Sequence, residues 1–322
     1  MKRFGLACGF LLASITVGLA EQYPSRPITI VVPFAAGGPI DTTTRIVADK
    51  MKDTHGQPII IENVGGAAGS LAAGRVAKAA PDGYTLITGI WGTHVANGAI
   101  YQLSYDVKDD FTPVALISSN PLLIVSSKQT PATTLKELVT WLKNNPDKAS
   151  QGTSGVGSVG HVAGAFFQAK TETKFRFIPY RGLAPAMQDL VAGTIDLMFD
   201  TPATSLPQVK SGNIRAHAVT SKVRIKAAPD IPTVDEAGLA GLYVSTWTAF
   251  FAPKGTSKEV VATLSKAVMS ALADPTVRAR LAEVGQDVYP ADQQSSEFLT
   301  TFQKDEIEKW WPIIKDAQIK VD

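Results

Sequence analysis

Two glycine-rich stretches carry the residue types that could hold an anion. In residues 31–41 an apolar run leads directly into Gly37 and Gly38, and in residues 151–161 three glycines lie among hydroxyl side chains. Where such a stretch begins a helix, several backbone N–H groups lack partners at the positive end of the helix dipole, and glycine leaves them uncovered. Each stretch therefore predicts a site for an anion.

A strand and a helix must position the first stretch. The apolar run 28–32 predicts a buried strand, and apolar residues then recur at helical spacing over 46–51. In an alternative interpretation Gly37 and Gly38 only turn the chain and Asp41 caps the helix. The segment alone does not decide between an anion site and a capped turn.

The second stretch also has alternatives. Residues 155–160 satisfy the G-x-G-x-x-G pattern, but the preceding residues are polar and no acid follows about 20 residues later, which disfavours a dinucleotide site. A flexible connection remains open. We favour a helix start flanked by the hydroxyls of Thr153, Ser154 and Ser158, which can donate hydrogen bonds to a carboxylate.

Strands alternate with short helical patterns along the chain, which predicts parallel sheets with helical crossovers. Ligands of such sheets bind outside the carboxyl ends of the strands. The candidate residues that follow predicted strands are Trp91, Thr93, His94, Tyr180, Arg181 and Asp200. Taken singly, His94 also fits a hydrogen-bonded loop residue, Asp200 a helix cap and Arg181 a solvated surface cation.

Length and hydropathy predict two domains. After a leader, about 300 residues with 45% hydrophobic content suit two compact cores. We place the first domain at 21–120 and 236–322 and the second at 121–235. Helices are predicted after the capping-box sequence Thr134–Glu137, over 258–272 and over 296–316.

The first twenty residues predict export. Lys2 and Arg3 precede an apolar run, and small residues stand before Glu21, as in a secretory signal peptide over 1–20. The single cysteine, Cys8, lies inside it, so the mature chain has no disulfide, thiol nucleophile or thiolate metal site. Removal of Lys2 and Arg3 lowers the basic count from 31 to 29 against 29 acidic residues, and a neutral chain is no natural partner of nucleic acid.

Several short motifs resemble the Bug family, the periplasmic receptors of tripartite tricarboxylate transporters. The match runs over nearly the whole mature length and is specific through the number and order of its motifs. They include Pro33-Phe34-Ala35-Ala36-Gly37-Gly38, Ala80-Pro81-Asp82-Gly83-Tyr84-Thr85-Leu86, Gly92-Thr93-His94, Ser154-Gly155-Val156-Gly157, Met198-Phe199-Asp200 and Ala252-Pro253-Lys254-Gly255. The resemblance implies an α/β, two-domain type II periplasmic binding protein of the Venus-flytrap kind, each domain a mostly parallel sheet flanked by helices.

The resemblance also implies where a small carboxylate binds. Its two loops correspond to Phe34, Ala36, Gly37, Gly38, Ile40 and Asp41, and to Ser154, Val156, Gly157, Ser158 and His161; Thr93, His94, Tyr180 and Asp200 line the remaining cleft. The chain departs from the family pattern at Pro39-Ile40, at Thr201 and at Trp91. With Phe34, Trp91 and Ile40 as apolar walls and Arg181 as partner of a second carboxylate, we expect an aliphatic or aromatic dicarboxylate.

The expected function is that of an extracytoplasmic receptor, acting as a monomer, that delivers its ligand to the membrane subunits of a transporter. We expect no cofactor and no metal. Cysteine is absent from the mature chain, G-x-S-x-G does not occur and the four histidines lack metal-ligand spacing. Two alternatives remain open. One is an exported hydrolase or isomerase in which Ser158, His161 and Asp200 converge, and the other is a ligand sensor for a membrane kinase.

Overall fold

The computed structural model describes residues 23–320 of the 322-residue chain. The expected signal peptide and Cys8 lie outside the described residues. Within 23–320, no helix combines the length and the apolar character that crossing a bilayer requires.

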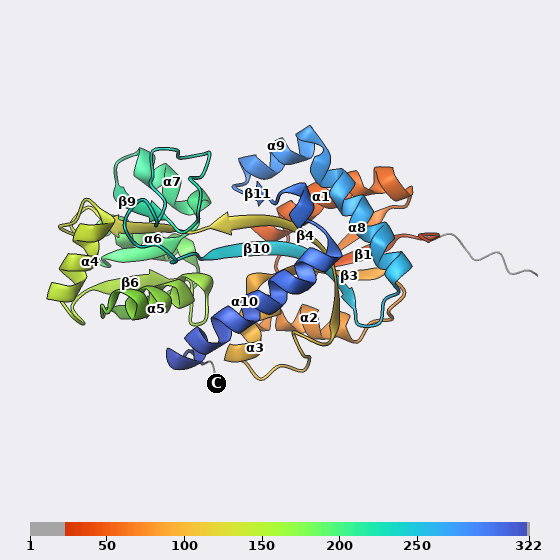
Figure 1. The fold of residues 1–322 in the computed structure, drawn as a ribbon, viewed down its shortest axis with the longest axis horizontal. Coiled ribbons are helices and arrows are strands. Elements are labelled where there is room, and N and C mark those ends of the chain that lie inside the picture. Colours follow the sequence, from red (N-terminus) through yellow and green to blue (C-terminus); the bar gives the residue numbers. More distant parts are fainter. Residues whose placement is uncertain (1–22, 321–322) are drawn as a thin grey trace, which may run out of the picture.

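Two β-sheets divide the described chain into two lobes, which lie side by side along the long axis of the molecule (Figure 1). The first lobe contains a six-stranded sheet in the order β11 (Asp287–Val288), β4 (Phe111–Pro121), β10 (Ser245–Pro253), β3 (Thr85–Ile90), β1 (Ile28–Val32) and β2 (Ile59–Asn63). The second lobe contains a five-stranded sheet in the order β7 (Arg176–Pro179), β6 (Ser150–Thr153), β8 (Leu197–Asp200), β5 (Leu123–Ser127) and β9 (Ile214–Val219).

Helices cover both faces of each sheet. The first lobe carries α1 (Pro39–His55), η1 (Ala67–Gly69), α2 (Ser70–Ala77), the π-helical η2 (Gly92–Ala96), α3 (Asn97–Ile100), α8 (Lys258–Ala273), α9 (Pro275–Glu283), η3 (Ala291–Gln293) and α10 (Ser296–Asp316). The second lobe carries α4 (Leu135–Asn144), α5 (Val159–Thr171), α6 (Leu183–Ala192) and α7 (Pro202–Lys210). The chain is therefore an α/β protein, as expected.

Pairing is parallel in the outer part of each sheet and antiparallel nearer the junction of the lobes. Strand β1 pairs in parallel with β2 and β3, and β6 does so with β7 and β8. Strand β10 is antiparallel to β3 and β4, and β5 is antiparallel to β8 and β9. The sheets are thus more mixed than expected, because β10 and β11 in the first sheet and β5 in the second run against the other strands.

Apolar burial explains these layers. One cluster joins Ile30 of β1 to Val47 of α1 and Val268 of α8, on one face of the first sheet. A second, larger cluster covers the opposite face and continues into the second lobe, where Phe199 belongs to it. Trp310 of α10 is fully buried in this cluster, with its ring 5.6 Å from that of Phe166 in α5. Burying such aromatic area contributes most of the packing energy between α10 and α5.

Several hydrogen bonds of Thr220 hold the junction of the lobes together. Its backbone N–H donates to the carbonyl of Leu122 at 2.8 Å, and the backbone N–H of Val244 donates to the carbonyl of Thr220 at 3.1 Å. The Thr220 hydroxyl accepts from the N–H of Leu122 at 2.9 Å and lies 2.5 Å from the carbonyl oxygen of Val244. Strands β4 and β10 run side by side into this junction (Figure 1), so we infer that it is the hinge.

We propose domain boundaries at 120/121 and 235/236, where the chain crosses between the lobes. Strand β4 ends at Pro121 and β5 begins at Leu123, so the first crossing lies beside the boundary placed at 120/121. On the return, Thr233 still pairs with Val219 of β9. The second lobe therefore extends at least to Thr233, next to the boundary placed at 235/236.

Candidate functional site

Two loops of the first lobe meet outside the carboxyl ends of the parallel strands β1 and β2. The amide of Asn63 donates to the carbonyl of Phe34 at 3.0 Å, which ties the loop after β2 to the loop after β1. A methyl group on Gly69 would lie 2.6 Å from Cγ2 of Thr93 and 3.6 Å from Cζ of Phe34. Phe34 and Thr93, both expected in the site, therefore lie close together, with Gly69 between them.

Asp41 holds the first glycine loop in place. Its Oδ2 accepts from the backbone N–H of Gly37 at 2.8 Å and from Nε of Arg45 at 2.9 Å, and its Oδ1 accepts from the amide of Asn63 at 3.0 Å. The Arg45 hydrogen bond, followed by those of Gly37 and Asn63, lowers the pKa of Asp41 to about 2. The Asp41 carboxylate thus has three partners within its own lobe, and its expected role as a ligand contact stays a prediction.

Ala36, Gly37, Gly38 and Ile40 surround the start of α1. Helix α1 begins at Pro39, its N-cap Gly38 provides no side-chain hydrogen bond, and Gly37 has a left-handed φ of +80°. Ala36 and Gly37 are exposed and line a hollow of about 580 Å³ that Glu283 of α9 also lines. The exposed backbone agrees with an anion-binding helix start, but the carboxylate of Asp41 already takes the Gly37 N–H.

The second glycine loop is organised by neutral groups. The backbone N–H of Gly157 donates to Nδ1 of His161 at 3.1 Å, and the N–H of His161 donates to Oγ of Ser158, the N-cap of α5, at 3.4 Å. Since Nδ1 accepts, the neutral imidazole carries its proton on Nε2. Burial lowers the pKa of His161, so it stays neutral near pH 7. The loop thus offers hydrogen-bond donors and no negative charge.

Tyr180 and Arg181 follow β7, beside this loop. The N–H of Tyr180 donates to the carbonyl of Thr153 at 2.9 Å, and a methyl group on Gly155 would lie 3.9 Å from the Tyr180 carbonyl oxygen. The Tyr180 hydroxyl donates to Asp189 at 2.6 Å. Burial and the Asp189 carboxylate raise the pKa of Tyr180 to about 12. Arg181 is exposed and forms no ion pair within the described chain.

Asp200 ends β8 and is buried with spare hydrogen-bonding capacity. Its Oδ2 accepts from Oγ of Ser205 at 2.5 Å, while its Oδ1 has no partner among the residues described. Burial raises the pKa of Asp200 to about 6. In the parallel pairing of β6 with β8, Gly152 lies opposite Met198, so Ser154 and Asp200 follow neighbouring strand ends. Asp200 is thus placed at the edge that carries the second glycine loop.

His94 and Trp91, both expected to line the cleft, have buried side chains, and Nε2 of His94 and Nε1 of Trp91 have no hydrogen-bond partner among the described residues. The ring of His94 stacks on Phe251 with centroids 4.1 Å apart, and its Nδ1 lies 2.8 Å from Oγ1 of Thr93. Burial lowers the pKa of His94 to about 3, so the ring is neutral. Trp91 is 2% exposed and packs edge to face on Trp310. Both side chains are core groups, and Trp91 no longer supports an apolar ligand.

The lobes approach each other at the second glycine loop. A methyl group on Gly157 would lie 3.0 Å from Cδ1 of Ile100, the last residue of α3. At another point, a methyl group on Gly285 in the first lobe would lie 3.9 Å from Cβ of Ala203 at the start of α7. The Gly157 loop therefore faces the first-lobe segment that follows β3, with Val156 beside it and 44% exposed.

The loop from Gly66 to Ser70 was missing from the candidate residues. Ala67 and Ala68 both have left-handed φ values, +46° and +51°, which cost energy for residues other than glycine and often occur at functional sites. Asn97 of α3 holds this loop, because its amide donates to the carbonyl of Ala68 and to Oγ of Ser70, both at 3.1 Å. The available signal was the glycine pattern of residues 63–70, which repeats that of the first loop.

The triad of the enzyme alternative is not assembled. Oγ of Ser158 bonds the backbone N–H of His161 and not its ring, Nδ1 of His161 bonds Gly157, and Asp200 bonds Ser205. In the described part of the chain, no group of three or more His, Cys, Asp or Glu residues could hold a metal ion.

Comparison with known proteins identifies the class. The fold, two lobes that each contain an α/β sheet and are joined by crossing strands, is that of the periplasmic solute-binding proteins. BugD, whose structure is described as that of a periplasmic binding protein, shares this fold with a TM-score of 0.76. The two sequences are 37% identical over 93% of this chain and 100% of BugD. The family model of the tripartite tricarboxylate transporter family receptor, TctC, matches residues 43–319. The chain belongs to this family, and the resemblance seen in its motifs is confirmed.

Two other relatives illustrate the match. A UPF0065 protein from the TAR-I ttuE-ttuC' intergenic region of Agrobacterium vitis is 41% identical over 297 residues, which cover 92% of this chain and 86% of that protein. MatC from Rhodopseudomonas palustris, solved with bound malate, has a TM-score of 0.76 and 40% identity over 91% of this chain and all of MatC. Another R. palustris receptor of the same fold, Rpa4515, was solved with adipate, at a TM-score of 0.79 and 33% identity over 93% of this chain and 100% of that receptor.

Proposed function

We propose that this protein is a periplasmic receptor that binds a small dicarboxylate between its lobes and delivers it to the membrane subunits of a tripartite tricarboxylate transporter. The observation that carries the proposal is the approach of the Gly157 loop to Ile100 across the lobes, beside a two-strand hinge. A ligand that contacts both lobes binds the closed form better than the open one, and so favours closure.

The proposed site divides the recognition of the acid group between the lobes. In the second lobe, the hydroxyl of Ser158 and the Nε2–H of His161 are neutral donors beside the start of α5. In the first lobe, α2 begins at Ser70, its N-cap Gly69 makes no side-chain cap hydrogen bond, and the first turn of the helix supplies the opposing N–H groups. Donors on neutral groups bind a carboxylate without a fixed counter-charge, which suits a chain of nearly balanced charge.

The proposed ligand is an aliphatic dicarboxylate. Malate in MatC and adipate in Rpa4515 both carry two carboxylates, and this chain is similar to both receptors. Phe34 and Ile40 are partly exposed and could contact the carbon chain between the acid groups. An aromatic dicarboxylate remains within the proposal but has lost the support of Trp91.

A ligand panel tests the proposal. Thermal shift and calorimetry would compare malate, succinate, adipate, terephthalate, citrate and aspartate with the monocarboxylate butyrate on the mature chain. We expect malate or adipate to raise the melting temperature and to bind at one per chain without chemical change, as checked by mass spectrometry. Stabilisation by citrate alone would refute the dicarboxylate, stabilisation by aspartate alone would replace malate and adipate with an amino dicarboxylate, and turnover would replace the receptor with an enzyme.

Delivery and location need separate experiments. Amino-terminal sequencing of protein released from the periplasm is expected to begin at Glu21, and light scattering is expected to give a monomer. Cross-linking of the ligand-loaded form in membranes is expected to capture a permease subunit. Capture of a histidine kinase would favour the sensor alternative.

A further inference from the structure

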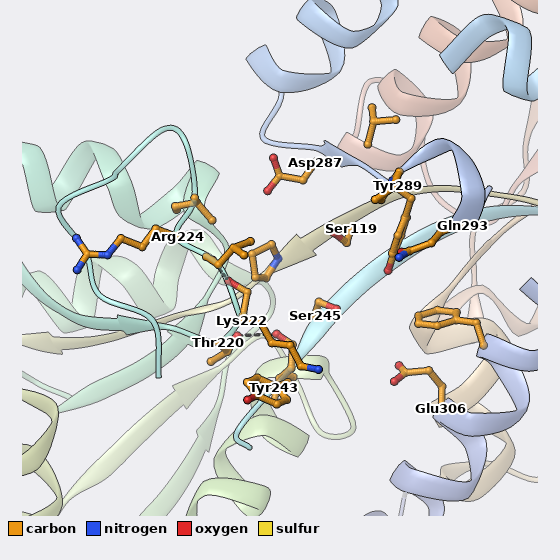
Figure 2. Close-up of a pocket in the computed structure, with 18 of the residues that line it drawn as sticks. Ser119, Thr220, Lys222, Arg224, Tyr243, Ser245, Asp287, Tyr289, Gln293 and Glu306 are labelled. Carbon is orange, nitrogen blue, oxygen red and sulfur yellow. Dashed lines mark hydrogen bonds between the residues drawn. The ribbon is translucent and has the colours of Figure 1, made fainter. Parts of the chain in front are cut away.

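A second cavity lies at the hinge, apart from the proposed cleft. Its volume is about 770 Å³, and none of the candidate cleft residues lines it. Thr220 and Ser245 stand at the hinge side, Tyr289 and Glu306 belong to the first lobe, and Lys222 to the segment that leaves the second lobe (Figure 2). The volume lies in the range of small-molecule sites.

The two walls of this hinge pocket carry opposite net charges. Asp287 and Glu306 lie on the wall formed by the first lobe, which also holds one cation, Lys309. Lys222 and Lys226 lie on the facing segment (Figure 2 labels Asp287, Glu306 and Lys222). Lys226 acts on Asp287 across the pocket, where its charge lowers the pKa of Asp287 against the rise caused by burial. A third cation, Arg224, is already paired with Glu236 at 2.8 Å and points away from the cavity.

Glu306 is held in place by two hydrogen bonds. Burial raises the pKa of its carboxyl group, and the charge of Lys309 and the hydrogen bonds of Trp310 and Trp247 act against this rise. Its Oε2 accepts from the indole N–H groups of Trp247 and Trp310, at 3.3 and 3.2 Å. No Lys, Arg or His of the described chain lies within ion-pair distance of it, and the nearby Lys309 donates instead to the carbonyl of Tyr243 at 2.7 Å. In Figure 2 the carboxylate of Glu306 points toward the cavity, so its second oxygen is positioned for a ligand.

Aromatic groups complete both walls. Phe302 and Tyr289 line the cavity near Glu306, with ring centroids 5.9 Å apart. On the other side the ammonium group of Lys222 lies 5.2 Å from the ring centroid of Tyr243. A carboxylate next to aromatic faces suits an alkylammonium group, and an ammonium group without an ion pair suits a carboxylate.

We propose that the hinge pocket is a second ligand site, for a dipolar molecule that carries an ammonium group and a carboxylate separated by an apolar chain. The ammonium group binds at Glu306, beside Phe302 and Tyr289, and the carboxylate binds at Lys222. A molecule with a single charge leaves one charged wall without its counterpart and binds less well.

Such a ligand is coupled to the cleft through the hinge. Thr220, Val244 and Ser245 line the pocket, and Thr220 and Val244 also form the hydrogen bonds that join the lobes. The affinity for a molecule between the two walls therefore depends on the angle between the lobes. By linkage, the two ligands affect each other equally. The factor by which the hinge-pocket ligand changes the affinity for the cleft ligand is the factor by which the cleft ligand changes the affinity for the hinge-pocket ligand.

The test uses a matched set of probes, 6-aminohexanoate, hexanoate and hexylamine, in calorimetric titrations of the whole mature chain. We expect one bound 6-aminohexanoate per chain, still bound in the presence of saturating adipate, and affinities for the other two probes at least about tenfold lower. Glu306→Gln keeps an acceptor for the two indoles, and Lys222→Gln keeps a flexible polar side chain without the charge, so both variants should fold. Each is expected to lower the affinity for 6-aminohexanoate about tenfold.

Lys136→Gln, a change at an exposed residue of α4, serves as the control and should bind the probe like the unmodified chain. The proposal is overturned if 6-aminohexanoate does not bind at millimolar concentration, if hexanoate or hexylamine binds equally well, if adipate displaces it stoichiometrically, or if both variants retain its affinity. Adipate titrations of the same variants report on the cleft independently, so failure of the second site is distinguishable from failure of the receptor function.

Discussion

Asp41 and Asp200 are carboxylates at equivalent places, one beside the glycine loop of each lobe, yet their surroundings are opposite. Asp41 accepts from Gly37, Arg45 and Asn63, and its pKa falls to about 2. Asp200 accepts from Ser205 through one oxygen, the other lacks a partner in the described chain, and burial raises its pKa to about 6. The comparison teaches that the first lobe uses its acid as a fixed part of the scaffold, whereas the second keeps an acid whose charge is easily lost.

The largest expected effect is on stability, from Asp41→Ala. The change removes three hydrogen bonds, leaves the Gly37 N–H without its acceptor and leaves Asn63 with only the Phe34 carbonyl, so we expect the free energy of unfolding at pH 7 to fall by about 2–4 kcal/mol. Urea denaturation measures it. The control is Asp53→Ala on the same helix, which breaks only an exposed ion pair with Lys50 and should cost less than about 0.5 kcal/mol. Equal losses in both variants would mean that Asp41 does not hold the loop.

Asp41 also gives stability a defined dependence on pH. Its folded pKa of about 2 lies below the ordinary value of 3.8, so its contribution is complete above about pH 4 and is lost as the pH falls toward 2. Since Arg45 is half exposed, we expect about 1–2 kcal/mol over this interval. The Asp41→Asn variant should lack this pH-dependent stability. Denaturation midpoints of the two proteins between pH 2 and pH 5 would measure the difference.

The next effect separates the two glycine loops. Gly37→Ala and Gly157→Ala both force alanine into a left-handed conformation, at φ of +80° and +76°, which costs about 1–2 kcal/mol of stability in each case. Space differs, because a methyl group on Gly37 meets nothing within 4 Å and one on Gly157 lies 3.0 Å from Ile100. We therefore expect only Gly157→Ala to weaken adipate or malate binding, by about tenfold.

Calorimetry with both ligands measures this difference. The double variant Gly157→Ala with Ile100→Val, which shortens the opposing side chain, is expected to recover part of the affinity. Equal weakening by Gly37→Ala and Gly157→Ala would mean that the close approach of Gly157 to Ile100 is not needed for ligand binding.

Asp200→Asn tests the other half of the comparison. The folded pKa of about 6 exceeds the ordinary value of 3.8, so the favourable contribution of Asp200 is complete below about pH 4 and is lost as the pH rises through 6. Between pH 4 and pH 7, we expect the free energy of unfolding to fall by about 1–2 kcal/mol more in the unmodified chain than in Asp200→Asn. Parallel stability curves for the two proteins over that range would contradict the raised pKa.

The smallest expected effect concerns Arg181. Because the side chain is exposed, an ion pair with a second ligand carboxylate would contribute only about 0.5–1 kcal/mol. Arg181→Ala should therefore weaken adipate about threefold and leave butyrate unchanged in calorimetric titrations. Equal losses for the two ligands would remove Arg181 from the site.

Local features were predictable because neighbouring residues decide them. The predicted strand 28–32 coincides with β1, and the predicted helix 296–316 coincides with α10, although Pro312 lies within it. The capping box at Thr134 and Glu137 is formed, with the N–H of Glu137 donating to Oγ1 of Thr134 at 3.2 Å. Each rests on apolar spacing or on a hydrogen bond within one turn.

Burial of the candidate site residues was not predictable in the same way. Trp91, Thr93 and His94 follow a strand as Tyr180 and Arg181 do, yet the first three are buried and the other two are partly or fully exposed. The difference comes from α10 and β10, more than 150 residues away, which supply Trp310 and Phe251. A motif shows which chemistry a residue can perform, but not what packs on it.

By itself, the sequence determined the α/β class, the family, the two glycine loops and the positions of most strands and helices, because these depend on spacing and on backbone freedom. Only the tertiary structure decided that Asp41 is saturated and Asp200 is not, that His94 is sealed between aromatic rings, and that oppositely charged walls enclose a cavity at the hinge. The physical reason is that the pKa, the exposed fraction and the partners of a side chain are set by atoms brought near it from distant segments.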